Sequence, residues 1–144
     1  MIINIPLYQL RNYPSFFELH ELLFGPTYSG QLLYQLEEKK NVQILAFKEK
    51  ERIVAYKLGY EVNKHTFYSW LGGVHPAHRR KGIASSLMSY QHDYCRGAGY
   101  TRITTKTTNK WRDMLILNLQ HGFQIVGTYV DHEKEIKIML EKTI

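Results

Sequence analysis

The sequence predicts a mixed α+β fold, in which helices cover the faces of one central sheet. Three patterns lead to this prediction. The first forty residues repeat apolar side chains at helical spacing, and residues 42–74 hold three strand-like runs separated by polar turns. After residue 75, helical and strand-like segments alternate to the end of the chain. In total we expect about seven strands and about four helices.

The first forty residues predict one strand and two helices. Residues 2–8 are expected to form a short strand. Pro14 suits the first turn of a helix over about 13–24, because its missing N–H is not needed there. Gly25-Pro26 ends that helix, and a second helix is expected to follow and to reach about Lys40.

Three strands are expected next, over about 42–48, 53–61 and 66–74. Glu49-Lys50-Glu51 forms a charged turn between the first two, and Asn63-Lys64 forms a turn before the third. Because these connections are short, neighbouring strands must run in opposite directions. The segment therefore predicts an antiparallel meander.

The remainder of the chain predicts alternating helices and strands. Gly97 and Gly99 are suited to the end of the first helix, since glycine readily adopts the left-handed conformation found there. The expected elements are a helix over about 83–96, a strand over about 100–107, a helix over about 110–120, and strands over about 123–130 and 135–141.

Length and composition restrict the class of protein. The chain has 144 residues, with 44% hydrophobic and 22% charged residues, which is ordinary for a globular protein and argues against disorder or a coiled coil. We expect one domain over residues 1–144. No apolar run approaches the ~20 residues that cross a bilayer. Cys95 is the single cysteine, which excludes an intramolecular disulfide. The N-terminal residues lack the pattern of a signal peptide, so a cytoplasmic location is expected.

The positive charge is concentrated in one segment. The formal net charge is +6, yet residues 78–112 carry eight basic residues and one acidic residue, or +7. The rest has eleven basic and twelve acidic residues, or −1. This segment should therefore attract an anion, such as a nucleic acid, a membrane phosphate or a phosphorylated small molecule.

The loop at 74–87 has the features of a phosphate cradle. It joins the end of a strand to the start of a helix, where unpaired N–H groups and the helix dipole favour an anion. Gly82 has no Cβ and lets the backbone approach a ligand, and Ala84 is small. Together with three cationic side chains, this pattern suits a pyrophosphate. It lacks the Walker A and dinucleotide-binding patterns, and a solvated basic turn before an amphipathic helix remains the alternative.

These residues resemble the GNAT superfamily of acetyl-CoA-dependent N-acetyltransferases. The family's loop has the pattern Q/R-x-x-G-x-G/A, matched here by Arg79-Arg80-Lys81-Gly82-Ile83-Ala84, and Val74-His75-Pro76 matches the preceding V-x-P. A later helix that ends in Gly-Phe before a strand is matched by 114–123. The expected order of elements is also similar to that of the family.

The resemblance implies a mostly antiparallel sheet that is splayed between strands 4 and 5. Gly72-Gly73 would permit a bulge at this point, although a plain strand end is the alternative. Acetyl-CoA would be the cosubstrate, and a primary amine would attack its thioester directly. The residues that this implies for cofactor binding are Gly73, Val74, Arg79, Arg80, Lys81, Gly82, Ile83, Ala84, Ser85 and Asn118.

The candidate catalytic residues are Asn118, Tyr68 and Tyr129. Asn118 stands where the family often has a tyrosine that serves the leaving thiolate. An amide can hydrogen-bond but cannot act as an acid, so Asn118 would position the cofactor, or it is simply a polar residue of the helix surface. The strand at 65–71 has no carboxylate, so the general base is not identified. Its polar side chains could relay a proton through water, or serve only the sheet.

Other residues are given structural interpretations. His75 and His78 have a metal-like spacing, but no metal site is expected because no cysteine or carboxylate stands near them, and contact with a phosphate or exposure to solvent is expected instead. Cys95 is expected to be half-buried rather than a nucleophile. The expected partner is a small-molecule or peptide amine, with no membrane, and a homodimer is possible. Alternatives are a catalytically silent acyl-CoA-binding domain and a small basic nucleic-acid-binding protein.

Overall fold

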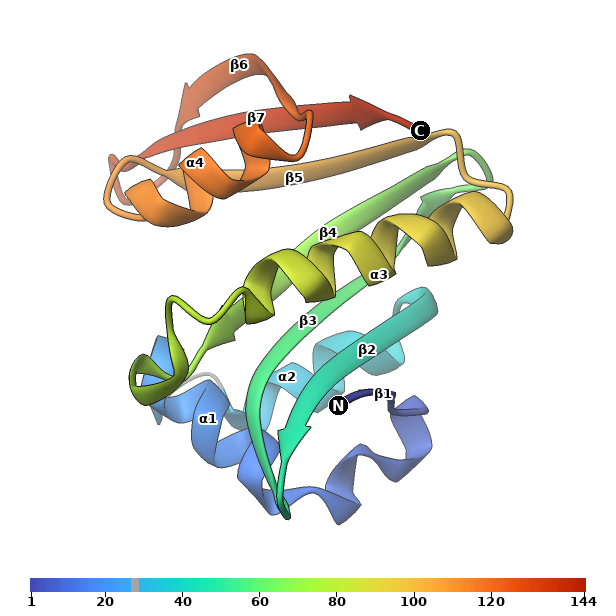
Figure 1. Cartoon of the computed structure of the whole chain (residues 1–144). Coiled ribbons are helices and arrows are strands. Elements are labelled where there is room, and N and C mark those ends of the chain that lie inside the picture. The colour runs from blue at the N-terminus through green and yellow to red at the C-terminus, as the bar shows by residue number, and fades with distance from the viewer. Residues whose placement is uncertain (27–28) are drawn as a thin grey trace.

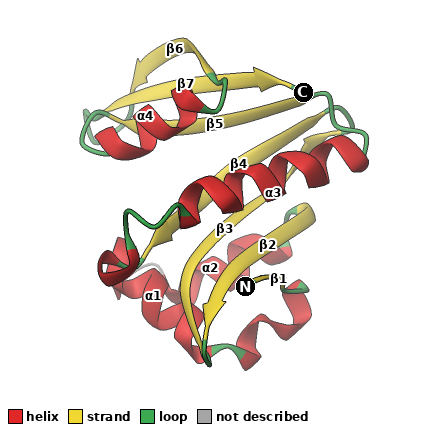
Figure 2. Ribbon diagram, viewed as in Figure 1, coloured by secondary structure: helices red, strands yellow, loops and turns green. Residues whose placement is uncertain are grey.

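The computed structural model describes residues 1–26 and 29–144. Its seven strands form one sheet in the order β1-β2-β3-β4-β5-β7-β6, with helices on both faces (Figure 2). The elements are β1 (Ile2–Asn4), the 3-10 helix η1 (Leu7–Asn12), α1 (Pro14–Phe24), α2 (Ser29–Glu37), β2 (Lys40–Glu49), β3 (Arg52–Asn63), β4 (Thr66–Val74), the 3-10 helix η3 (Pro76–His78), α3 (Ile83–Gly97), β5 (Arg102–Thr108), α4 (Arg112–Gln120), β6 (Gln124–Val130) and β7 (Ile136–Thr143).

The sheet divides into two arms that part between β4 and β5. All neighbouring strands are antiparallel except this pair, which is parallel and is joined only from Thr66 to Ser69 and from Arg102 to Thr105. Beyond those residues the two strands diverge and leave a V that opens toward the end of β4 (Figure 1). The predicted fold class and its splay are confirmed.

Two apolar layers hold the helices on the sheet. On one face, Phe16 and Leu19 of α1 and Leu36 of α2 are buried against β2 and β3. On the other face, Met88 of α3 is buried against the strands of both arms. Full burial of each such side chain contributes about 1.5–3 kcal/mol, so both helical layers are firmly attached. None of the described helices is long and apolar enough to cross a membrane.

The N-terminal strand is shorter than predicted. The strand expected over 2–8 ends at Asn4, and Pro6 precedes the 3-10 helix η1. Pro6 has no N–H to donate to a sheet, and η1 turns Leu10 into the core. The second predicted helix ends at Glu37 and β2 begins at Lys40, earlier than expected. Residues 27–28, which follow Gly25-Pro26, lie outside the described residues.

The predicted bulge at Gly72-Gly73 is wrong. These two residues pair regularly with Lys57 and Tyr56 of β3. The register of the two strands shifts instead between Leu58 and Gly59, which leaves Trp70 of β4 without an opposite residue. The bulge therefore lies at Trp70, next to the point where β4 and β5 part.

Close packing explains the glycines near this bulge. A Cβ on Gly59 would lie 2.4 Å from the Tyr68 carbonyl oxygen, so only glycine fits opposite the bulge. A Cβ on Gly73 would lie 2.7 Å from Leu23 Cδ1, because α1 packs directly on β4 there. Gly73 therefore allows α1 to pack against β4, and it does not form a bulge.

Candidate active site

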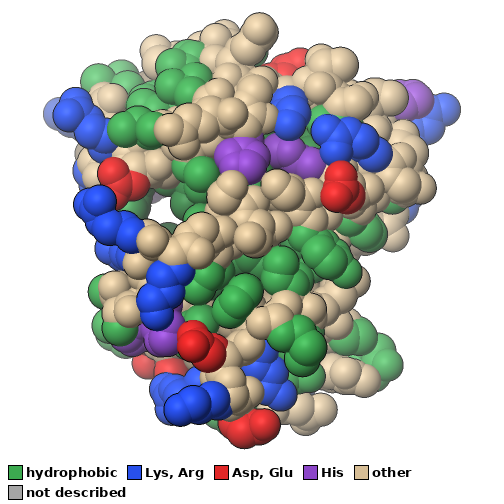
Figure 3. All heavy atoms as spheres, viewed as in Figure 1, with side chains coloured by type: hydrophobic (Ala, Val, Ile, Leu, Met, Phe, Trp, Pro, Cys, Tyr) green, Lys and Arg blue, Asp and Glu red, His purple; other side chains and the backbone are tan. Residues whose placement is uncertain are grey.

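The two arms enclose a cleft past Ser69 and Thr105. The space-filling view shows a hollow between the arms, open at its left side, with Lys and Arg side chains along its rim (Figure 3). The start of α3 and the loop before it lie at the open side of the V in the ribbon view (Figure 1).

The edge of β4 presents free backbone groups to this cleft. The His75 N–H donates to the Val54 carbonyl over 2.8 Å, so in the alternating antiparallel pattern Gly72 and Val74 direct their N–H and C=O groups away from β3. The Val74 carbonyl accepts Nε–H of Arg79 at 3.1 Å. The Val74 N–H and both groups of Gly72 remain at the cleft, whereas the backbone of Gly73 faces β3.

The loop before α3 leaves backbone amides unpaired at the start of that helix. Arg80 and Gly82 have positive φ angles, 64° and 77°, which curl the backbone around the helix start. The first helical hydrogen bond runs from the Ser86 N–H to the Gly82 carbonyl, so the amides of 83–85 precede it and are free to bind an anion. No heavy atom lies within 4 Å of a Cβ built on Gly82, which leaves room for a ligand.

The side chains of this loop have different surroundings. Arg79, Arg80 and Lys81 are exposed and keep their positive charge beside the helix start. Ile83 is buried against β2 and fixes the orientation of α3, so it can serve a ligand only through its backbone. Ala84 is half-buried and leaves the approach to the helix open.

Ser85 joins the two arms. Its hydroxyl lies 2.8 Å from Nε2 of His121, the residue that follows α4. Next to it, His92 is buried with Nδ1 at 3.1 Å from the Lys142 ammonium. Burial, with Lys142 and Lys57 nearby, lowers the pKa of His92 to about 3 and also lowers that of His121, so both rings are neutral at neutral pH.

Asn118 is the buried residue of α4. It lies one turn before His121 and therefore on the side of α4 that faces α3. Its carbonyl accepts the N–H groups of His121 and Phe123, at 3.2 and 3.0 Å, and so ends the helix. Its side-chain amide remains a candidate for contact with a ligand in the cleft.

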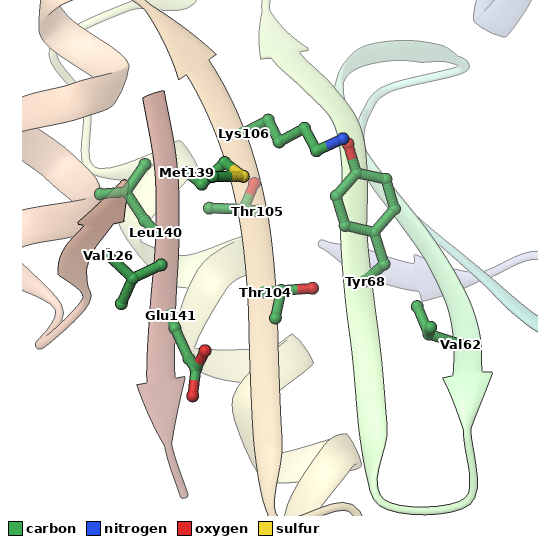
Figure 4. A pocket seen from close by; sticks show the side chains of 9 residues that line it. All are labelled: Val62, Tyr68, Thr104, Thr105, Lys106, Val126, Met139, Leu140 and Glu141. Carbon is green, nitrogen blue, oxygen red and sulfur yellow. The ribbon is translucent and has the colours of Figure 1, made fainter. Parts of the chain in front are cut away.

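Tyr68 and Tyr129 gather on the opposite face of the sheet, beside Lys106. Tyr68 and Lys106 line a cavity of about 370 Å³ (Figure 4). The Lys106 ammonium lies 5.3 Å from the ring centre of Tyr129. Burial raises the pKa of Tyr68, and the neighbouring Tyr60 and Tyr129 raise it further, so its phenol stays protonated and can donate a hydrogen bond.

The structure thus brings together two of the three candidate catalytic residues. Tyr68 and Tyr129 share one face, and Asn118 lies on the face that carries α3 and α4. Only a ligand threaded between the arms could contact both sides. Ser69 is buried and its carbonyl accepts the Thr105 hydroxyl at 2.8 Å, whereas His65 lies in the exposed turn at the closed end of the V.

Comparison with known proteins identifies the family. A family model described as Acetyltransferase (GNAT) family matches residues 11–123. The chain belongs to the GNAT acetyltransferase family. The resemblance inferred from the loop and the Gly-Phe helix is therefore confirmed, and the protein is an acetyltransferase of that family. A search of curated protein sequences found no match.

Solved structures share this GNAT fold along nearly the whole chain. An IAA acetyltransferase from Bacillus cereus ATCC 14579 has a TM-score of 0.82 at 17% identity. The match covers 100% of this chain and 99% of the other. An aminoglycoside 6'-acetyltransferase type Ii has a TM-score of 0.84 at 15% identity, and the match covers 99% of this chain and 96% of the other. A GNAT acetyltransferase from Elizabethkingia anophelis, with acetyl-CoA bound, has a TM-score of 0.75 at 17% identity, and the match covers 99% of this chain and 98% of the other.

Two lysines of this GNAT protein were missed from its sequence. Lys57 lies in an otherwise apolar strand segment, and that contrast was the available signal. Its stem packs beside Gly72, and burial lowers its pKa to about 8. It forms no ion pair with a carboxylate in the described part of the chain. Lys106 follows Thr105, the last residue of β5 that pairs with β4, and this position can be known only from the strand register.

His75, His78 and Cys95 have the following surroundings in this GNAT fold. The His75 Nδ1 accepts the N–H of Ala77, and the His78 Nδ1 lies 3.0 Å from Glu49. Within residues 1–26 and 29–144, no three metal-binding side chains come together. Cys95 is fully buried, which raises the pKa of its thiol to about 12 and makes it a poor nucleophile at neutral pH.

Proposed function

We propose that the protein moves an acetyl group from acetyl-CoA to a primary amine by direct attack, as a single cytoplasmic domain. The observation that supports this most is the junction of the cradle with the splay. The free amides at the start of α3 lie at the mouth of a cleft whose wall is the unpaired edge of β4. A molecule with a pyrophosphate at one end and a polar arm at the other fits both features.

The cofactor-binding residues follow from this arrangement. The amides of 83–85, with Arg79, Arg80 and Lys81, would hold the pyrophosphate. The groups of Gly72 and Val74 that face the cleft would hydrogen-bond the pantetheine arm. When bound, acetyl-CoA supplies an acetyl thioester. Asn118, on the α4 side of the cleft, would orient the thiol end by hydrogen bonding.

The acceptor amine would approach from the face that carries Tyr68 and Tyr129. An alkylamine has a pKa of about 10 and must lose a proton before it can attack. Because Tyr68 stays protonated, we assign it a hydrogen bond to the acceptor or to a water that carries the proton away. Tyr129, with its ring beneath Lys106, would complete the wall of the acceptor site.

Two measurements test this proposal together. Calorimetry should detect binding of acetyl-CoA to the folded protein, and a thiol reagent should detect release of CoA when a panel of primary amines is added. Binding without thiol release for any amine would favour a silent acyl-CoA-binding domain. No binding at millimolar acetyl-CoA would overturn the proposal, and salt-dependent binding of DNA that acetyl-CoA does not displace would favour a nucleic-acid-binding protein.

A further inference from the structure

We infer that the acceptor amine also carries a carboxylate, and that Lys106 binds this carboxylate at the fork of the sheet. The inference rests on the proposed function, because it assigns the acceptor class of the same site. It follows from the position, the charge balance and the size of the cavity in Figure 4.

Lys106 stands at the fork itself. It is the first residue of β5 past Thr105, the last one paired with β4. In the close-up, its side chain extends from β5 toward the hydroxyl end of Tyr68 on β4 (Figure 4). An acceptor held by Lys106 would therefore lie where the cleft between the arms opens onto this face.

The charges around the cavity leave Lys106 as the cation without an acidic partner. Glu141, the one carboxylate that lines the cavity, lies 3.4 Å from the Arg102 guanidinium. The neighbouring lysines of this face are also paired, since Lys110 and Lys137 lie 3.2 and 3.0 Å from Glu135. Among the described residues, Lys106 has no ion pair, and its ammonium lies 5.3 Å from the ring centre of Tyr129.

The unpaired positive charge of Lys106 disfavours an acceptor with several positive charges and favours one with a single negative charge. A polyamine would place a second ammonium near Lys106 without a free carboxylate to offset the repulsion. A carboxylate would instead form a charge-assisted hydrogen bond with Lys106, and the hydroxyls of Tyr68 and Thr104 can donate to it. A phosphate carries more charge than one lysine neutralises, and Glu141 is already paired with Arg102.

The cavity has the size and lining for a small molecule. Its volume of about 370 Å³ falls at the low end of the ~300–1,000 Å³ typical of ligand sites. Val62, Val126 and Met139 supply apolar walls beside the polar groups. An amino acid, with one amine and one carboxylate close together, fits this site better than a large sugar with several amines.

The test compares matched acceptors on matched variants. L-amino acids are assayed as free acids and as amides, which differ only in the negative charge of the carboxylate. Phosphoethanolamine and a polyamine are assayed as additional acceptors. For the wild type, kcat/KM for the acid should exceed that for the amide by about 10- to 100-fold, the range of a charge-assisted hydrogen bond. Lys106→Met should bring this ratio near unity, and Lys106→Glu should invert it. Lys64→Met, in an exposed turn, should leave it unchanged.

A binding measurement separates this inference from the proposed function. Saturation-transfer NMR without acetyl-CoA should show contact of the acid, but not of the amide, with wild-type protein, and Lys106→Met should abolish it. This result can hold even if no acetyl transfer occurs. Equal signals for acid and amide, or a preference for phosphoethanolamine or the polyamine, would overturn the assignment of a carboxylate-bearing acceptor.

Discussion

The Ser85 hydroxyl lies 2.8 Å from Nε2 of His121 and connects the two arms of the splayed sheet. Ser85 belongs to α3, which packs on β2, β3 and β4, whereas His121 follows α4, which packs on β5. β4 and β5 no longer pair past the fork, so side chains connect the arms, including Phe24 against Trp111 and His92 beside Lys142. This bond therefore helps to set the width of the cleft.

Replacement of Ser85 tests this role. We expect Ser85→Ala to lower the free energy of unfolding by about 1 kcal/mol, the net value of one hydrogen bond. Ser86→Ala is the matched control, because Ser86 is exposed on the same turn. Urea denaturation measures both. Equal stability of the two variants would mean that the bond does not hold the arms together.

Gly82→Glu tests the cradle. The new carboxylate would stand where the pyrophosphate is expected, so we predict at least about 100-fold weaker binding of acetyl-CoA, or roughly 3 kcal/mol. A side chain at positive φ also costs about 1–2 kcal/mol of stability. Gly99→Glu controls for this strain, since Gly99 has a φ of 91° and open space around it. Calorimetry should show normal affinity for the Gly99 variant, and retained affinity in Gly82→Glu would show that the cradle is elsewhere.

Gly73→Ala tests the packing of α1 on β4. The added Cβ would lie 2.7 Å from Leu23 Cδ1, so we expect a loss of about 1–3 kcal/mol of stability from overpacking. The double variant with Leu23→Ala should cost less than the sum of the two single changes, because it relieves the clash. Strict additivity in thermal and urea unfolding would contradict the contact.

His92 predicts a pH dependence of stability. Its pKa is about 3 in the folded protein against the ordinary histidine value of 6.5, so the unfolded chain binds the extra proton between these two values. Stability should therefore decline as the pH falls below 6.5, by at most about 1.4 kcal/mol per pH unit from this group. Lys142, Lys57, His121 and Arg96 all oppose its charge.

The variant His92→Gln should remove that part of the slope, and exposed His65→Gln should not. Urea denaturation between about pH 5 and pH 8 is the measurement. A slope that His92→Gln leaves intact would show that another group causes the acid sensitivity.

Lys57 predicts a stabilising substitution. Burial lowers its pKa from 10.5 to about 8, so the half-buried ammonium destabilises the folded protein at neutral pH. Lys57→Met should raise the stability at neutral pH, and its advantage over the wild type should shrink as the pH rises from about 8 toward 10.5. Lys64→Met, exposed, should be neutral. A destabilised Lys57→Met would show that the ammonium has a partner when the protein folds.

Local sequence patterns predicted most elements but not their contacts. Regular periodicity placed α1, α3 and the meander strands within a few residues, because those patterns depend on neighbours close in the chain. The bulge was misplaced to Gly72-Gly73 because glycine alone does not distinguish a bulge from a close approach. In the structure, Leu23 of α1, far away in the chain, requires the small residue at Gly73.

The candidate site divides in the same way. Local sequence indicated the family and the position and charge of the proposed cradle, because Gly82 and its basic neighbours belong to one short loop. Tertiary structure alone decided that Ser85 reaches His121, that Asn118 and Tyr68 lie on opposite faces, and that Lys106 stands unpaired at the fork. These relations depend on strand register and on helix packing between distant segments, and a one-residue change of register moves a side chain to the other face of the sheet.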